Sequence, residues 1–145
     1  MLGICLIDET GHNALELFNR AALTAEEIKD DLQAHIRIYE PEAHQRHLEE
    51  FRILADFNAA LKSGEIQFFV QPQVNVTNGS VVGVESLARW RRSDGSYVPP
   101  TVFVPVLEKY GIIGNLDFFI WESVCKWIRH LIDSGIRPVP VSVNV

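Results

Sequence analysis

The chain has 145 residues, 47% hydrophobic and 22% charged, which is enough to bury a core without a disulfide or a metal ion. Its net charge of −6 disfavours binding to a nucleic acid polymer, which usually requires a basic surface. Cys5 and Cys125 lie far apart inside apolar runs, which predicts buried free thiols and a cytoplasmic location, and no stretch reaches the roughly 18 uncharged apolar residues of a membrane-spanning helix.

The first forty residues predict a β-α-β unit. Residues 3–7 form an apolar run that ends in turn-forming residues, which indicates a short buried strand. From about residue 13 to 32, apolar residues recur every three or four positions, the pattern of an amphipathic helix. Residues 35–39 are typical of a second short strand.

A helix of about twenty residues is predicted next. Pro41 suits the first turn of a helix, and the apolar positions from Leu48 to Leu61 form a stripe that stops at Ser63 and Gly64. Three roles are open for this helix: a surface for a partner, a signalling linker between domains, or a cover for one end of the domain that follows.

The pattern changes to that of a β-hairpin at Glu65. Residues 66–76 and 81–90 are rich in β-forming side chains, and Asn78 and Gly79 between them favour a tight turn. Helical segments at about 101–110 and 116–134 then lead to a final strand at 139–145. Both ends of the chain fall on apolar strands without a predicted partner, so we expect the chain to be a piece of a longer protein.

The acidic charge is concentrated in the first part of the chain. Residues 1–62 hold 12 acidic and 6 basic residues, whereas residues 63–145 hold 7 of each. Arg89, Arg91 and Arg92 cluster just after Glu85, which indicates a candidate site for a phosphate-bearing ligand. A solvated strand end is the alternative interpretation of this cluster.

The hairpin sequence resembles the opening of the EAL family, whose members are phosphodiesterases that cleave cyclic di-GMP. The run from Phe68 to Val74 matches first, and the Glu-Ala-Leu motif that names the family reads here as Glu85, Ser86 and Leu87, followed by Arg89 and Trp90. The middle position is therefore changed from Ala to Ser. The resemblance extends over about residues 65–145 and ends at Val143 and Asn144, which are similar to the family's Val-Asn strand.

Residues 1–40 resemble the tail of a GGDEF domain, the cyclase partner often fused in front of EAL, without the Gly-Gly-Asp-Glu-Phe signature itself. The two resemblances imply an α/β fold: a partial (β/α) TIM-like barrel of the EAL type at 63–145, preceded by the GGDEF tail and by a linker helix at 41–62. A complete barrel needs about 200 residues or more. We therefore expect the chain to be inactive alone and to associate through unpaired strand edges, as a homodimer or a swapped assembly.

The resemblance also assigns roles to five residues. Glu85 and Asn144 are the implied ligands of Mg²⁺ or Mn²⁺, which prefer oxygen donors, and both are expected at strand ends on one rim of the barrel. Gln71 is implied to contact the dinucleotide, Leu87 to face the guanine region and Arg89 to meet a phosphate oxygen. No catalytic set is complete in this sequence, because the family's remaining acids and its lysine lie on later strands.

These residues imply one part of a cytoplasmic GGDEF-EAL signalling protein, whose EAL domain hydrolyses cyclic di-GMP to linear di-GMP with divalent metal ions. The alternative is a non-catalytic cyclic di-GMP receptor or regulatory scaffold with a degenerate EAL domain, with which Ser86 is compatible. Arg91 and Arg92 match no role in the family, which favours solvated side chains for both, and Trp90 is expected in the core.

Overall fold

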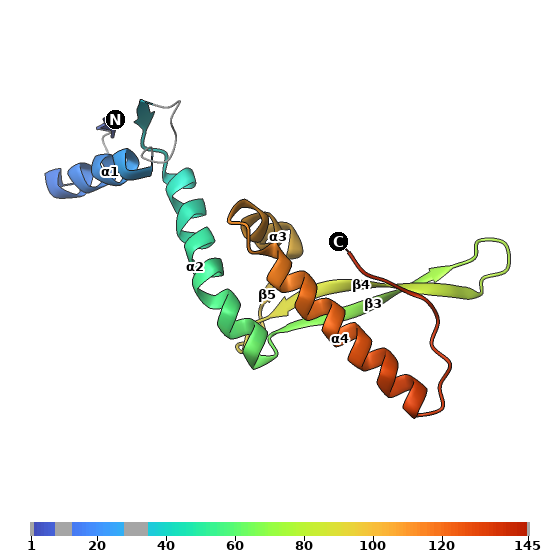
Figure 1. Cartoon of the computed structure of the whole chain (residues 1–145). Helices are drawn as coiled ribbons and strands as arrows, with labels where there is room; N and C mark the ends of the chain where they lie inside the picture. Colours follow the sequence, from blue (N-terminus) through green and yellow to red (C-terminus); the bar gives the residue numbers. More distant parts are fainter. Residues whose placement is uncertain (1, 8–12, 28–34, 145) are drawn as a thin grey trace. The chain divides into compact units, whose positions relative to one another are not determined.

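The computed structural model describes residues 2–7, 13–27 and 35–144 and divides the chain into two compact units, residues 1–49 and 50–145. Figure 1 shows the order of the elements along the chain. None of the helices within the described ranges is both long enough and apolar enough to cross a membrane.

The first unit is the predicted β-α-β arrangement. Strands β1 (Leu2–Ile4) and β2 (Ile36–Ile38) pair in parallel, and helix α1 (Ala14–Glu27) packs on them. Strand β1 is shorter than predicted because its partner offers three paired residues, so Leu6 and Ile7 lie outside the strand and are exposed. Residues 28–32 of the predicted helix lie outside the described residues.

The predicted burial of the two thiols is wrong, although both are free. Cys125 is exposed, because it lies on the outer side of a helix whose opposite side faces the core. Cys5 is only partly buried, because strand β1 ends one residue before it.

Helix α2 (Pro41–Ser63) confirms the predicted long helix and begins at the proline, as expected. Its C-terminal half contributes buried side chains to the second unit, namely Ile53, Phe57 and Ala60. It is followed by Gly64, whose φ of +79° is a backbone conformation that glycine adopts at little cost.

The second unit is built on the predicted hairpin. Strands β3 (Ile66–Val74) and β4 (Val81–Arg91) pair antiparallel. Strand β3 ends two residues earlier than predicted, so the connection at 75–80 is longer than a tight turn at Asn78 and Gly79, and Gly79 has a φ of +70° in it. Strand β5 (Tyr97–Val98), which the sequence pattern did not indicate, pairs with the end of β4. Strand β6 (Val141–Ser142) pairs in parallel with the middle of β4 and is shorter than the predicted strand at 139–145, because only two of its residues meet partners there.

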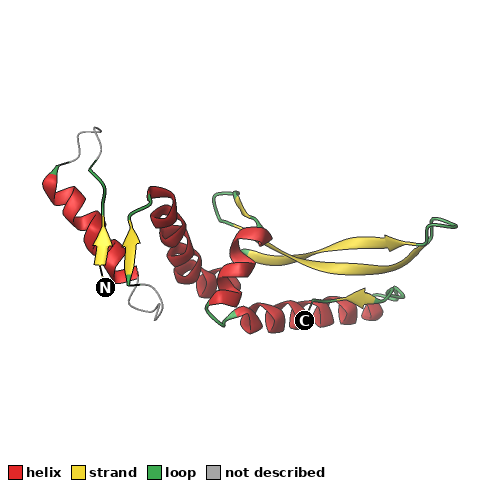
Figure 2. Ribbon diagram, turned by 90° about the horizontal axis from the view of Figure 1, so that it is seen from above, coloured by secondary structure: helices red, strands yellow, loops and turns green. Residues whose placement is uncertain are grey.

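Helices α3 (Pro100–Lys109) and α4 (Ile113–Asp133) connect β5 to β6 and cover one face of the hairpin, and Figure 2 shows α4 running alongside the two long strands. The core between the layers includes Trp90, as expected from the sequence. The described residues thus form a mixed α/β fragment with one crossover between parallel strands in each unit, and their strands do not close into a barrel.

Candidate functional site

The register of the hairpin determines which side chains share a face. Glu85 pairs directly with Gln71, Leu87 with Phe69, and Arg89 with Gln67. Directly paired residues project from the same face of an antiparallel ladder, and alternate residues of a strand share that face. The predicted site residues of the hairpin, Gln71, Glu85, Leu87 and Arg89, therefore lie together on one face, which we call the ladder face.

The other face of β4 packs against the helices. Val84 and Trp90 are buried there, and Ser86 and Ala88 line a pocket together with residues of α3 and α4. The ladder face is consequently the side of the hairpin that helices α3 and α4 leave uncovered. Its side chains are partly buried on β4 and exposed at Gln71 on β3.

Glu85 does not lie at a strand end, as the sequence suggested, but in the middle of β4. The strand continues beyond Glu85 because β3 pairs with it as far as Trp90 and β5 pairs with its last two residues. Strand β6 pairs with it at Glu85 itself, opposite Ser142. Within the described ranges the Glu85 side chain has no hydrogen bond and no ion pair. Its carboxylate is therefore not committed to a protein partner.

Arg89 also carries an uncompensated charge. Its Nη1 donates a hydrogen bond to the neighbouring carbonyl oxygen of Ala88 at 2.8 Å, and no acidic side chain among the residues that the structure describes is paired with it. A guanidinium that retains free donors is suited to bind a phosphate oxygen. Arg89 and Glu85 are four residues apart on the same strand and so combine a cation and an anion on the ladder face.

Asn144 lies two residues beyond β6 and is exposed. Its backbone carbonyl oxygen accepts a hydrogen bond from Trp121 Nε1 at 3.1 Å. No hydrogen bond joins Asn144 to Glu85 in the described part of the chain, and no group of three or more His, Cys, Asp or Glu residues there could hold a metal ion. Both predicted metal ligands are oxygen donors, and their role in holding a metal ion stays a prediction.

A pocket of about 290 Å³ lies on the helix side of β4. Ser86 is 2% exposed, lines this pocket, and its hydroxyl has no hydrogen-bond partner. Two carboxylates also line it, Glu108 of α3 and Asp117 of α4. Sequence reasoning missed these two acids because only the turn between the helices brings them to one pocket, and their spacing along the chain matches no site motif.

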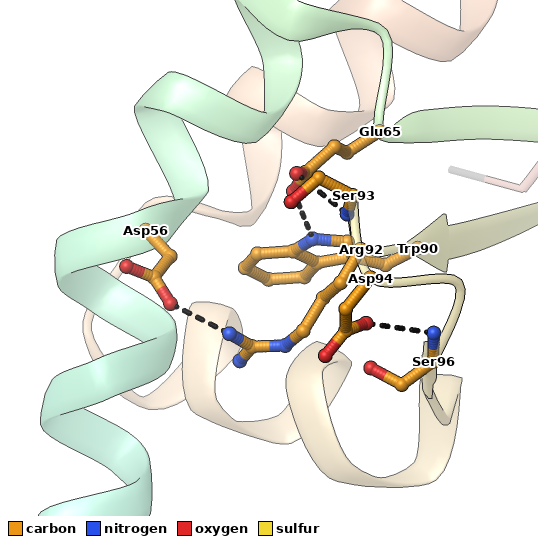
Figure 3. Close-up of polar contacts among 7 residues, drawn as sticks. All are labelled: Asp56, Glu65, Trp90, Arg92, Ser93, Asp94 and Ser96. Carbon is orange, nitrogen blue, oxygen red and sulfur yellow. Dashed lines mark hydrogen bonds and ion pairs between the residues drawn. The ribbon is translucent and has the colours of Figure 1, made fainter.

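A second polar cluster surrounds Trp90 (Figure 3). Glu65 accepts one hydrogen bond from Trp90 Nε1 at 3.3 Å and another from the backbone N–H of Ser93 at 3.0 Å. Arg92, predicted to be solvated, instead forms an ion pair with Asp56 of α2 at 2.9 Å. This prediction failed because the partner lies 36 positions earlier in the chain, on another element.

The turn after β4 is ordered by a side-chain cap. The backbone N–H of Ser96 donates to Asp94 Oδ1 at 2.8 Å. Hydrogen bonds from the Ser96 hydroxyl and then from its backbone N–H hold the pKa of the Asp94 carboxyl below its ordinary value. Arg91 differs from its neighbour Arg92, since its exposed side chain makes no hydrogen bond or ion pair with any described residue.

Comparison with known proteins agrees with the resemblance for most of the chain. The EAL domain family matches residues 54–145. The bifunctional diguanylate cyclase/cyclic di-GMP phosphodiesterase MucR of Pseudomonas aeruginosa is 27% identical over 144 residues, which is 99% of this chain and 21% of that protein. The probable cyclic di-GMP phosphodiesterase PdeG of Escherichia coli is 48% identical over 85 residues, 59% of this chain and 17% of that protein. The chain thus spans about a fifth of the length of these curated relatives.

Superpositions on solved structures agree with the family match. The PaMucR phosphodiesterase in complex with c-di-GMP superposes with a TM-score of 0.58 at 30% identity, over 65% of this chain and 38% of that one. The S helix-GGDEF-EAL part of Vibrio cholerae LapD, bound to c-di-GMP, superposes with a TM-score of 0.56 over 99% of this chain and 34% of that one. Its 15% identity supports the fold alone.

Proposed function

The chain belongs to the EAL domain family, and on that premise we propose that its ladder face binds cyclic di-GMP as part of a phosphodiesterase site. The observation that carries the proposal is the register of the hairpin, which gathers Gln71, Glu85, Leu87 and Arg89 on one face. Two of these four side chains carry charges that no described protein group neutralises, which is what a site for a charged ligand requires.

Each of these residues contributes a different interaction. Arg89 places a guanidinium where it donates hydrogen bonds to a phosphate oxygen. Gln71, opposite Glu85, offers an amide that both donates and accepts hydrogen bonds. Leu87 lies between Glu85 and Arg89 along the face and presents an apolar surface suited to one side of a guanine ring.

The oxygen donors of the site are of the chemical type that a divalent metal ion prefers. Glu85 and Asn144 provide a carboxylate and amide oxygens, the ligands that Mg²⁺ and Mn²⁺ prefer, and we propose that both hold the metal. Such an ion supplies an activated water and stabilises charge that develops on a phosphate. These two residues alone would not complete the ligand set of such an ion, so further oxygen donors would have to take part.

The domain organisation that we propose is a GGDEF tail at 1–40, a linker helix at 41–62 and the first part of an EAL domain at 63–145. It is supported by the division into two compact units at residues 49 and 50 and by the family match that begins within α2. The similarity over nearly the whole chain to MucR, a bifunctional diguanylate cyclase/cyclic di-GMP phosphodiesterase, supports the same order. The parent protein would then be a cytoplasmic GGDEF-EAL signalling protein.

A receptor without catalytic activity is the second candidate. Three of the four predicted residues on the ladder face, Gln71, Leu87 and Arg89, are assigned to the dinucleotide rather than to a metal ion. The hairpin therefore contains more of the residues predicted to bind the dinucleotide than of those predicted to take part in its hydrolysis. The change to Ser86 within the motif is also compatible with a protein that senses cyclic di-GMP or acts as a scaffold.

The test is chromatographic detection of linear di-GMP after the purified chain is mixed with cyclic di-GMP and Mg²⁺ or Mn²⁺. A longer protein that continues beyond Val145 is assayed in parallel. Turnover by the longer protein supports the phosphodiesterase function. Binding of cyclic di-GMP without turnover by either protein supports the receptor, and absence of binding by both contradicts the proposed function.

We further propose that the isolated chain self-associates. Among the described residues, the outer edges of β3 and β6 have no strand partner, and large apolar side chains such as Phe69 and Val74 on β3 are about half exposed. Unpaired edges favour strand addition by a second copy. Light scattering should therefore give a mass above that of one chain, and a monodisperse monomer would contradict this expectation.

A further inference from the structure

Arg92 connects two elements that are far apart in the sequence. Its Nη1 lies 2.9 Å from Asp56 Oδ2 on helix α2, and its guanidinium lies 5.7 Å from the ring centroid of Trp90, at the end of strand β4 (Figure 3). A guanidinium at this distance from an indole ring is within the range of a cation–π contact. One side chain thus contacts both the helix and the strand.

Trp90 itself is held on several sides. It is fully buried, and its ring packs against Phe57 of α2 at a centroid distance of 6.2 Å and against Phe103 of α3 at 5.6 Å. Its Nε1 donates a hydrogen bond to Glu65, the residue that joins α2 to β3. The position of the ring is therefore set largely by the C-terminal half of α2 and its continuation.

The backbone that follows Trp90 is fixed to Glu65. The N–H of Arg91 donates to the Glu65 carbonyl oxygen at 2.8 Å, and the N–H of Ser93 donates to its carboxylate at 3.0 Å. Arg89 precedes Trp90 directly and projects from the opposite face of β4. A shift of Trp90 therefore moves the backbone that carries Arg89.

We propose that Arg92 is a positioning residue, which couples helix α2 through Trp90 to the placement of Arg89 on the ladder face. The role suits arginine, because its planar group pairs with a carboxylate and stacks on an aromatic ring at the same time. The proposal rests on the proposed function only for the identity of the ligand at Arg89. The coupling between α2 and β4 is a property of the protein alone.

The coupling gives α2 a regulatory role at the proposed site. The helix is continuous over its 23 residues, and Asp56 lies within it, directly before Phe57. A rotation of the helix about its axis would change the position of Asp56 and Phe57 together. Arg92 and Trp90 would follow, so the affinity of the ladder face for its ligand would depend on the state of α2.

The first experiment tests the coupling between α2 and β4 in the absence of ligand, by two-dimensional NMR of the full chain. We expect Asp56→Asn and Arg92→Gln each to shift the indole Nε1 resonance of Trp90 and the backbone amide resonance of Arg89. Arg91→Gln is the matched control, because this neighbouring arginine has no side-chain partner among the described residues, and it should leave the Trp90 resonance in place. Unchanged Trp90 and Arg89 resonances in the first two variants would overturn the proposal, as would an equal shift in the control.

The second experiment titrates the same proteins with cyclic di-GMP. We expect Asp56→Asn and Arg92→Gln to weaken binding about two- to fivefold, the range set by a partly exposed ion pair. The double variant should bind no more weakly than Arg92→Gln alone, because that change already removes the ion pair with Asp56. Shifted resonances with unchanged affinity would overturn the role of Arg92 in ligand placement. If the unaltered chain does not bind cyclic di-GMP, the proposed function fails, while the NMR result still decides the coupling.

Discussion

Gln71 and Glu85 are directly paired across the β3–β4 ladder, so their side chains project from the same face. The register changes at Gln73 and Val74, next to the turn, and is regular from Gln73 to Ile66. A slip of one residue would turn Glu85 toward the helices and Ser86 toward the ladder face. The composition of the site therefore depends on the pairing that the turn establishes.

Replacement of Glu85 by Gln should leave the fold intact and abolish metal-dependent turnover in a phosphodiesterase that contains this hairpin. The substitution changes the charge of one proposed metal ligand and almost none of its volume. The Glu85 side chain has no partner in the described part of the chain, so we expect the free energy of unfolding to change by less than about 0.5 kcal/mol. Turnover assays and thermal unfolding of the same protein check the two expectations.

Glu122→Gln provides the control for this charge removal. Glu122 forms an exposed ion pair with Lys126 on α4, at 2.8 Å and away from the ladder face. An exposed pair of this kind contributes little to stability. Equal loss of turnover in both variants would remove Glu85 from the proposed site.

Ser86→Ala should stabilise the protein. The hydroxyl is almost fully buried and has no hydrogen-bond partner, and an unsatisfied buried polar group costs about 1–3 kcal/mol. Removal of this group should raise the free energy of unfolding by about 1 kcal/mol, as measured by urea denaturation. A lower stability of the variant would show that the hydroxyl has a partner in solution, such as a water molecule in the adjoining pocket.

The elements that the sequence predicted well are those with local causes. Asn78 and Gly79 specify the turn that forms the hairpin, and Pro41 specifies the start of α2. The four hairpin residues of the site were also found, because the motif spans one strand and its direct partner. In such cases the neighbours in sequence determine the neighbours in space.

The features that could not be predicted depend on distant pairing. Strand β5 has two residues and exists because the end of β4 leaves an edge open to it. The mid-strand position of Glu85 follows from the full length of β3, and the ion pair of Arg92 requires Asp56 on another element. Neither the spacing nor the charge of these residues contains that information.

Acid titration of Asp94 should detect the hydrogen bonds that its carboxyl accepts from Ser96. The Ser96 hydroxyl is the largest cause of the depressed pKa of this carboxyl, so Ser96→Ala should raise the pKa of Asp94 toward its ordinary value. A depressed folded-state pKa stabilises the ionised form, so the contribution of the cap is present at neutral pH and is lost as the pH falls through that pKa. NMR titration of the Asp94 carboxyl carbon measures both variants, and an unchanged pKa would contradict the role of Ser96.

Trp90→Phe should destabilise the second unit more than Trp121→Phe. Both indoles donate one hydrogen bond, but Trp90 is fully buried and bonds to the Glu65 carboxylate, whereas Trp121 bonds to a carbonyl oxygen in an exposed position. We expect a loss of about 2 kcal/mol for Trp90→Phe and less than about 1 kcal/mol for Trp121→Phe. Urea denaturation of the two variants gives the comparison, and similar losses would show that the buried indole bond contributes no more than the exposed one.

Gly3→Ala should disrupt the first unit and spare the second. A Cβ atom at this position would overlap the backbone carbonyl oxygen of Ala21 and lie 2.6 Å from the backbone nitrogen of Ala25, so α1 would have to move away from β1. Such overpacking costs about 1–3 kcal/mol. Hydrogen exchange should accelerate at the amides of β1 and β2 and remain unchanged in β3 and β4, because the two units are separately compact.

Gly114→Ala is the opposite case in the second unit. No heavy atom lies within 4 Å of a Cβ built at Gly114, which is the second residue of α4. Alanine is favoured over glycine in a helix by up to about 1 kcal/mol, so this variant should slow exchange in α4 or leave it unchanged. The Gly3→Ala variant, by contrast, adds an atom only to the first unit. Faster hydrogen exchange in β3 and β4 of that variant would therefore show that the two units do not unfold independently.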